Sequence, residues 1–146
     1  MRGEIVILCI GSNQVVGDSV GPMVGDYLKK TQIQAYVYGT MTRPVNAKNL
    51  KAYGEMIREH HANALLIVVD STVGNSGDVG EVRITKNGVK PGGAAGKNIP
   101  RIGDIGILGV VGKKGGSLVS TLMNVDISVV ECLSIKIGGL LKKAIG

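Results

Sequence analysis

The stretch IVILCIGSNQVVGDSVGP, residues 5–22, indicates an α/β fold and contains the first candidate functional residue. Its first six residues are apolar, which is the pattern of a strand buried on both faces of a parallel sheet. Glycines and small polar residues follow and surround one carboxylate, Asp18. Pro22 suits the first turn of a helix. A buried strand that leads through a glycine-rich loop into a helix predicts a functional loop at the carboxyl end of a parallel strand.

The composition is that of a folded domain. With 146 residues, 44% of them hydrophobic, the chain is long enough to bury a core, and we expect one domain over residues 1–146. The longest apolar runs, such as residues 64–69, are too short to cross a bilayer, and the first residues lack the pattern of a signal peptide. We therefore expect a cytoplasmic protein with no membrane partner.

The net charge of +6 does not by itself predict a nucleic-acid partner. Lysine pairs are scattered along the chain, and the absence of Phe and Trp leaves little for stacking on bases. Cys9 and Cys132 lie in apolar patterns with no Cys or His at metal-ligand spacing, so we expect both to be buried.

The remaining pattern alternates between strands and helices. A second buried run, ALLIVVD at 64–70, resembles the first, and NG at 87–88 is a hairpin signal that predicts an antiparallel addition. Together the elements predict a three-layer α/β/α sandwich on a mixed, mainly parallel sheet. The expected strands are 4–10, 33–40, 64–70, 79–90 around its turn, and 104–112; the expected helices start near Pro22 and near a cap at Asn46, and then cover 115–124 and 127–141.

Two aspartates occupy the positions where open α/β sheets bind ligands. Asp18 lies in the loop after the first strand, and Asp70 ends the strand LLIVVD. If these strands are neighbours, both loops open into one crevice and the two carboxyls face each other. Mutual repulsion would raise one pKa and leave the other group ionised, so that Asp18 is the candidate base and Asp70 holds the proton. The structural alternative is that Asp18 caps a helix and Asp70 ends a strand with an Asx-turn.

Other motifs give weaker signals. The glycine-rich segments match neither a dinucleotide fingerprint nor a P-loop, although the loop around Lys97 could cradle an anion. His60 and His61 end a helix, where serving the helix dipole is commoner than binding metal. Tyr36 and Tyr38 alternate on a strand and are interpreted as packing residues. No G-x-S-x-G motif supports a serine hydrolase.

Taken together, three long motifs resemble the YyaC-type sporulation proteins, relatives of the spore germination protease and of the peptidases that mature hydrogenases. They are CIGSNQVVGDSVGP, VYGT with Pro44 and AKNL, and PGGAAGKNIPRIGDIGI. The resemblance implies a phosphorylase/hydrolase-like α/β/α fold and peptide-bond hydrolysis. It also places the two aspartates of the germination protease at Asp18 and Asp70. In the hydrogenase-maturing relatives the matching acidic pair, helped by a His, holds a metal; no such His is evident here, so we expect no metal or other cofactor.

Our leading hypothesis is a sporulation-associated peptidase in which Asp18 and Asp70 share the attacking water. The expected substrates are small spore proteins, and the protein could form a homo-oligomer. Arg43 and Asn46 depart from the family pattern, which favours the alternative of an inactive protein that binds a peptide or an anion. A third possibility is a metal-dependent peptidase with the aspartates as ligands. Besides the pair, the residues expected to bind the substrate are Gly11, Ser12, Asn13, Lys97 and Asp104.

Overall fold

The computed structural model describes residues 3–91 and 100–146. Within these residues the chain forms one five-stranded sheet with the strand order β2-β1-β3-β5-β4. All neighbouring pairs are parallel except β4 and β5, which are antiparallel. The strands are β1 (Ile5–Cys9), β2 (Tyr36–Tyr38), β3 (Leu65–Gly74), β4 (Val82–Lys86) and β5 (Ile105–Lys113).

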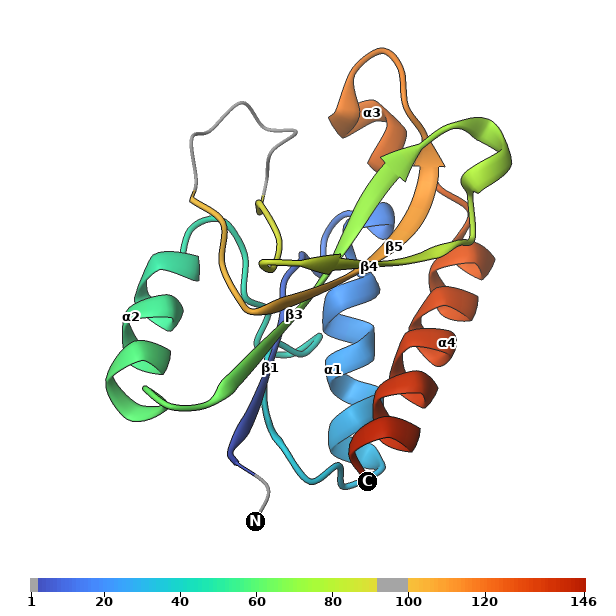
Figure 1. The fold of residues 1–146 in the computed structure, drawn as a ribbon. Helices are drawn as coiled ribbons and strands as arrows, with labels where there is room; N and C mark the ends of the chain where they lie inside the picture. Colours follow the sequence, from blue (N-terminus) through green and yellow to red (C-terminus); the bar gives the residue numbers. More distant parts are fainter. Residues whose placement is uncertain (1–2, 92–99) are drawn as a thin grey trace.

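Helices cover both faces of this sheet (Figure 1). Helices α1 and α4 pack together on one face, α2 lies on the other, and α3 lies beyond the carboxyl end of β5. The described residues therefore form the predicted three-layer α/β/α arrangement on a mixed, mainly parallel sheet. The helices are α1 (Val20–Lys30), α2 (Leu50–His60), α3 (Leu118–Met123) and α4 (Ile127–Ile145), with short 3-10 turns η1 (Val16–Asp18) and η2 (Ser76–Asp78).

The central strands are apolar throughout because both of their faces are covered. In β1, Ile7 and Cys9 belong to the core under α1 and α4, whereas Val6 and Leu8 belong to the core under α2. All four side chains are fully buried. The same alternation runs through β3, so the continuous apolar runs indicate a sheet buried on two sides.

Several element boundaries differ from the sequence prediction. Helix α1 begins at Val20 rather than near Pro22, and the expected strand over 33–40 is limited to β2. Helix α2 begins after Asn49 rather than at the predicted cap Asn46. The reason is a local turn in which the Asn49 side-chain oxygen accepts the Asn46 N–H at 2.8 Å, while the Asn46 carbonyl accepts the first N–H of the helix.

The prediction of a hairpin turn at Asn87 and Gly88 is wrong in its position. Both residues have positive φ, of 65° and 73°, as the turn motif predicts. They do not reverse the chain, because Val89 continues the antiparallel pairing of β4 and pairs with Ile102 in the same register. The antiparallel addition is present, but its partner is β5, and the connection comes after Val89.

The two cysteines differ in environment. Cys9 is buried in the core, whereas Cys132 is exposed on α4, so the expectation that both are buried is wrong for Cys132. The helical periodicity placed Cys132 near the apolar stripe of α4, but the residue falls just outside the part that packs on the sheet. Among the described residues, none of the helices combines the length and apolar character needed to cross a membrane.

Both ends of the described chain lie at the amino ends of the strands. The Glu4 carbonyl accepts the N–H of Leu65, the first residue of β3, at 2.9 Å. The Gly146 carbonyl accepts the N–H of Gln34, shortly before β2, at 3.2 Å. The opposite, carboxyl edge of the sheet is left to the loops that follow β1 and β3 (Figure 1).

Candidate active site

Asp18 and Asp70 come from neighbouring strands at this carboxyl edge. The register pairs Cys9 with Val69, and the Ile10 N–H donates to the Val69 carbonyl at 2.8 Å. β1 ends there, and its chain passes through the loop to η1, which contains Asp18. On β3 the next residue after Val69 is Asp70. Adjacency of the two strands, on which the sequence argument depended, is therefore present in the structure.

The loop between β1 and η1 is folded tightly against Asp18. The Asp18 carbonyl accepts the Ser12 N–H at 2.8 Å, and a Cβ on Gly11 would collide with that carbonyl oxygen. Only glycine fits at position 11, because any side chain would displace the backbone of Asp18 or the ring of Pro22. Gly11 and Ser12 thus position the backbone that carries the Asp18 carboxyl.

Asp70 is buried, with 8% of its surface exposed, and its Oδ1 accepts the N–H of Ser71 at 2.8 Å. The hydroxyl oxygen of Ser71 is also buried and has no hydrogen-bond partner among the described residues. Buried hydroxyl groups are normally hydrogen-bonded, so this group is available to a water or a bound molecule. It was not singled out from the sequence; its only signal was its position directly after Asp70.

Burial controls the protonation of the pair. Desolvation raises the pKa of Asp18 to about 6. Desolvation and the nearby charge of Asp18 raise the pKa of Asp70 well above its usual value, and the Ser71 N–H offsets only part of this rise. Near neutral pH the pair therefore favours an ionised Asp18 beside a protonated Asp70.

Both carboxyls line one cavity of about 380 Å³. Its walls come from β3, from the end of β4 and the residues after it, and from α3. Polar groups other than the two aspartates are also present, including two cations. Besides the two aspartates, the lining residues include Ser71, Thr72, Thr85, Gly88, Lys90, Arg101, Leu118 and Leu122.

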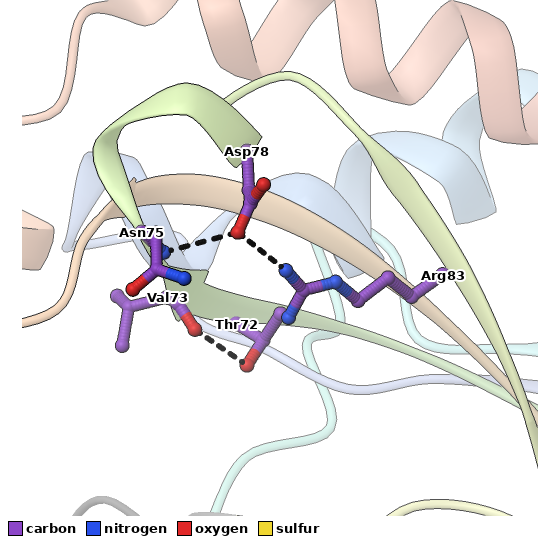
Figure 2. Close-up of polar contacts among 5 residues, drawn as sticks. All are labelled: Thr72, Val73, Asn75, Asp78 and Arg83. Carbon is purple, nitrogen blue, oxygen red and sulfur yellow. Dashed lines mark hydrogen bonds and ion pairs between the residues drawn. The ribbon is translucent and has the colours of Figure 1, made fainter.

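The wall formed by β3 is held in place beyond Asp70. The pairing of β3 with β5 shifts register between Thr72 and Val73, and both residues line the cavity. Figure 2 shows how the following turn is fixed: the Asp78 carboxylate accepts the Asn75 N–H at 3.3 Å and forms an ion pair with Arg83 at 3.0 Å. These contacts fix the turn that follows this wall.

Among the described residues, the predicted substrate-binding residues Asn13 and Asp104 do not line the cavity. Asn13 lies in the same loop between β1 and η1, and its side chain donates to the Met41 carbonyl at 2.9 Å. Asp104 lies just before the amino end of β5, where its carboxylate accepts the Leu66 N–H at 2.8 Å. Lys97 lies outside the described residues.

The histidines also lie away from the cavity. His61 forms an ion pair with Glu4 through Nδ1, and its Nε2 is 2.7 Å from the Tyr38 hydroxyl. Among the described residues, no three His, Cys, Asp or Glu side chains gather in a way that could hold a metal ion. A catalytic zinc commonly has three protein ligands, so the described aspartate pair does not fit such a centre.

Comparison with known proteins supports the family resemblance. A family model described as "Protein of unknown function (DUF1256)" matches residues 1–138. The uncharacterized protein YyaC of Bacillus subtilis (strain 168) is 38% identical over 127 residues. The match covers 86% of this chain but only 62% of that protein.

Solved structures with low sequence identity share the fold. A hydrogenase 3 maturation protease has a TM-score of 0.62 at 13% identity, covering 99% of this chain and 93% of its own. A peptidyl-tRNA hydrolase has a TM-score of 0.63 at 12% identity, covering 99% and 95%. The hydrogenase maturating endopeptidase HybD from E. coli has a TM-score of 0.52 at 14% identity, covering 97% and 93%. At these identities the likeness is one of fold.

Proposed function

The chain belongs to the DUF1256 family and is similar to YyaC, and we propose that it is a peptidase whose catalytic groups are Asp18 and Asp70. The observation that carries the proposal is the position of two carboxyls with raised pKa values on the wall of one cavity. Perturbed carboxyl groups that share a cleft are typical of acid–base sites. The peptidase neighbours support hydrolysis at the level of the fold alone.

In the proposed reaction a water molecule lies between the two carboxyls. Ionised Asp18 takes a proton from the water as its oxygen attacks the carbonyl carbon of the scissile peptide bond. Protonated Asp70 donates its proton to the developing oxyanion. The proton held by Asp18 then passes to the leaving amine as the C–N bond breaks. At the same step Asp70 takes a proton back from a hydroxyl of the tetrahedral intermediate, which forms the carboxylic acid product and restores both carboxyls to their starting states. Each carboxyl therefore needs the protonation state that its surroundings favour.

Three further side chains of the cavity suit this reaction. The buried hydroxyl of Ser71 is placed beside Asp70 and can hydrogen-bond to the water or the substrate. Lys90 and Arg101 add positive charge to the wall, which favours a negatively charged transition state. Lys97, the cation named from the sequence, stays a prediction in this role. The substrate-binding role also stays a prediction for Gly11, Ser12, Asn13 and Asp104. For Gly11 and Ser12 the contacts support a different role, which is to position Asp18.

The proposed substrates are small spore proteins, bound in extended form in the cytoplasm of a sporulating cell. This assignment follows from the family resemblance. To test it, we would incubate such proteins with wild type, Asp18→Asn and Asp70→Asn and identify fragments by mass spectrometry. Asp26→Asn is the matched control, because Asp26 is exposed on α1 and outside the cavity. We expect cleavage by wild type and by the control only.

Cleavage that survives both cavity substitutions would remove the aspartate mechanism. If wild type cleaves nothing but binds these proteins reproducibly and tightly, the alternative of an inactive binding protein is supported. A loss of activity on adding a chelator, together with stoichiometric metal in the purified protein, would instead make the aspartates metal ligands.

A further inference from the structure

A second cavity, also of about 380 Å³, lies between α2 and residues 100–102. Its floor is apolar and includes Leu50, Gly54 and Ile102. Its rim carries Lys51, Arg58 and Arg101. We call this cavity, defined by these six residues, the α2 groove.

Gly54 keeps the α2 groove open at a cost to the helix. It lies inside α2, where glycine is less favourable than alanine. Its φ is not in the left-handed range, and a Cβ there would meet only Ile102 Cδ1, at an ordinary contact distance of 3.6 Å. Neither the backbone nor the packing of the described residues therefore requires glycine. What an added side chain would change is the space in the groove.

The α2 groove and the cavity of the aspartate pair share one described lining residue. Arg101 lines both cavities. Its guanidinium is fixed by donating to the carbonyls of Asn87 at 3.2 Å and Gly88 at 3.1 Å. Arg101 is therefore the point at which a chain held near Asp18 and Asp70 would reach the groove.

The charges of the α2 groove select one chemistry. Three cations line it, and no carboxylate does so among the described residues; the acidic residues of α2, Glu55 and Glu59, are not part of its wall. The described lining also has no aromatic ring on which a base could stack. Positive charge around an apolar floor suits an acidic polypeptide that carries an apolar side chain better than it suits RNA.

We propose that the α2 groove is the specificity site of the peptidase and binds an acidic segment of the substrate next to the scissile bond. One apolar side chain of that segment occupies the space over Gly54, and flanking carboxylates pair with Lys51, Arg58 and Arg101. This inference rests on the proposed function, because it takes the aspartate cavity as the place of cleavage.

The test measures binding separately from cleavage. The Asp70→Asn protein is titrated into a short fluorescent peptide in which one Leu is flanked by Glu residues, and the anisotropy is followed. Comparison probes are the same peptide with Gln for Glu, the same peptide with Ser for Leu, and a single-stranded RNA of equal length. We expect the Glu/Leu peptide to bind about tenfold more tightly than each of the other peptides and the RNA.

Groove variants are made in the same background. Arg58→Glu is expected to weaken binding of the Glu/Leu peptide about tenfold, and Gly54→Leu, which fills the floor, to weaken it similarly. The control Lys143→Glu makes the same charge change on exposed α4 and is expected to leave affinity within about twofold. Circular dichroism verifies that each variant is folded, and Gly54→Ala serves as the smaller change if Gly54→Leu does not fold.

The outcomes separate the two proposals. If peptide binding depends on Arg58 and Gly54 but wild type cleaves nothing, the groove is a binding site for an acidic polypeptide and the catalytic proposal fails. If wild type cleaves and Arg58→Glu leaves KM unchanged, the catalytic proposal holds and the groove assignment fails. Tighter binding of the RNA than of the Glu/Leu peptide, or equal binding of all probes, would overturn the assignment to an acidic polypeptide.

Discussion

Asp18 and Asp70 lie at the carboxyl edge of the sheet, where burial and then the charge of Asp18 raise the pKa of the Asp70 carboxyl. The two residues are far apart in sequence and come together because β1 and β3 are neighbours. The relationship is electrostatic as well as spatial, so it has consequences for both activity and stability as pH changes.

Activity should depend on pH through both carboxyls. Asp18, with a pKa of about 6, must be ionised, so kcat/KM is expected to rise between pH 5 and pH 7, by close to tenfold per unit below the pKa. Asp70 must keep its proton, so activity should fall again at higher pH. Because the two groups interact, the limbs of the profile belong to the pair. A profile that is flat between pH 5 and pH 7 would contradict the assignment of Asp18 as the base.

The substitution Asp70→Asn, which removes the buried carboxyl, should stabilise the fold most at high pH. A carboxyl whose pKa is raised by folding contributes stability below its ordinary pKa of 3.8, and this contribution is lost as pH rises toward the folded value. Asp70→Asn keeps an acceptor for the Ser71 N–H and removes the charge. The difference in Tm between the variant and wild type is therefore expected to be larger at pH 8 than at pH 4. An equal difference at both pH values would argue against a protonated Asp70.

The loop that carries Asp18 should not tolerate a side chain at Gly11. Gly11→Ala would push a Cβ into the Asp18 carbonyl and the ring of Pro22, and we expect a loss of about 1–3 kcal/mol in unfolding free energy. Gly77→Ala is the matched control, because a Cβ there meets nothing within 4 Å. Urea denaturation of the two variants measures the contrast. Comparable losses in both would show that the loop can rearrange.

At Gly54 the expected effects on stability and on function have opposite signs. Gly54→Ala should raise the free energy of unfolding by up to about 1 kcal/mol, since alanine is the better helix former and its Cβ fits. The same variant narrows the α2 groove and is expected to raise KM. Denaturation and steady-state kinetics on one preparation measure both effects. A destabilised Gly54→Ala would mean that the helix itself requires glycine at this position.

The two thiols should react at very different rates. Burial raises the pKa of Cys9, so this thiol is both inaccessible and uncharged. Cys132 is exposed on α4. A thiol reagent is expected to label one cysteine per native molecule, and Cys132→Ser should abolish that labelling. Rapid labelling of both thiols under native conditions would contradict the burial of Cys9.

The parts of the fold that depend on local patterns were predictable from the sequence. The runs at 5–10 and 64–70 are apolar because each strand is covered on both faces. That pattern predicts two buried parallel strands, with Asp18 in the loop after the first and Asp70 at the end of the second, but their adjacency is given by the structure. Long-range pairing was less accessible. The motif at Asn87 and Gly88 predicts the correct backbone conformation at these two residues. It does not predict that the strand before it, β4, pairs with β5.

The walls of the site were the least predictable part. Arg101 enters the cavity because the carbonyls of Asn87 and Gly88 orient it, and nothing local to Arg101 indicates this contact. Asp104 has the residue type of a ligand-binding group but is used to bind the backbone of Leu66. The exposure of Cys132 depends on the rotation of α4 against the sheet, which its periodicity defines only approximately.

The position of Glu4 and Gly146 at the amino ends of the strands has a practical consequence. A biotin attached next to Glu4 or Gly146 emerges on the side of the molecule opposite to the aspartate cavity. The protein can therefore be immobilised through either position with its cavity facing the solution. Surface-based capture of spore polypeptides from both orientations should then give the same ligands.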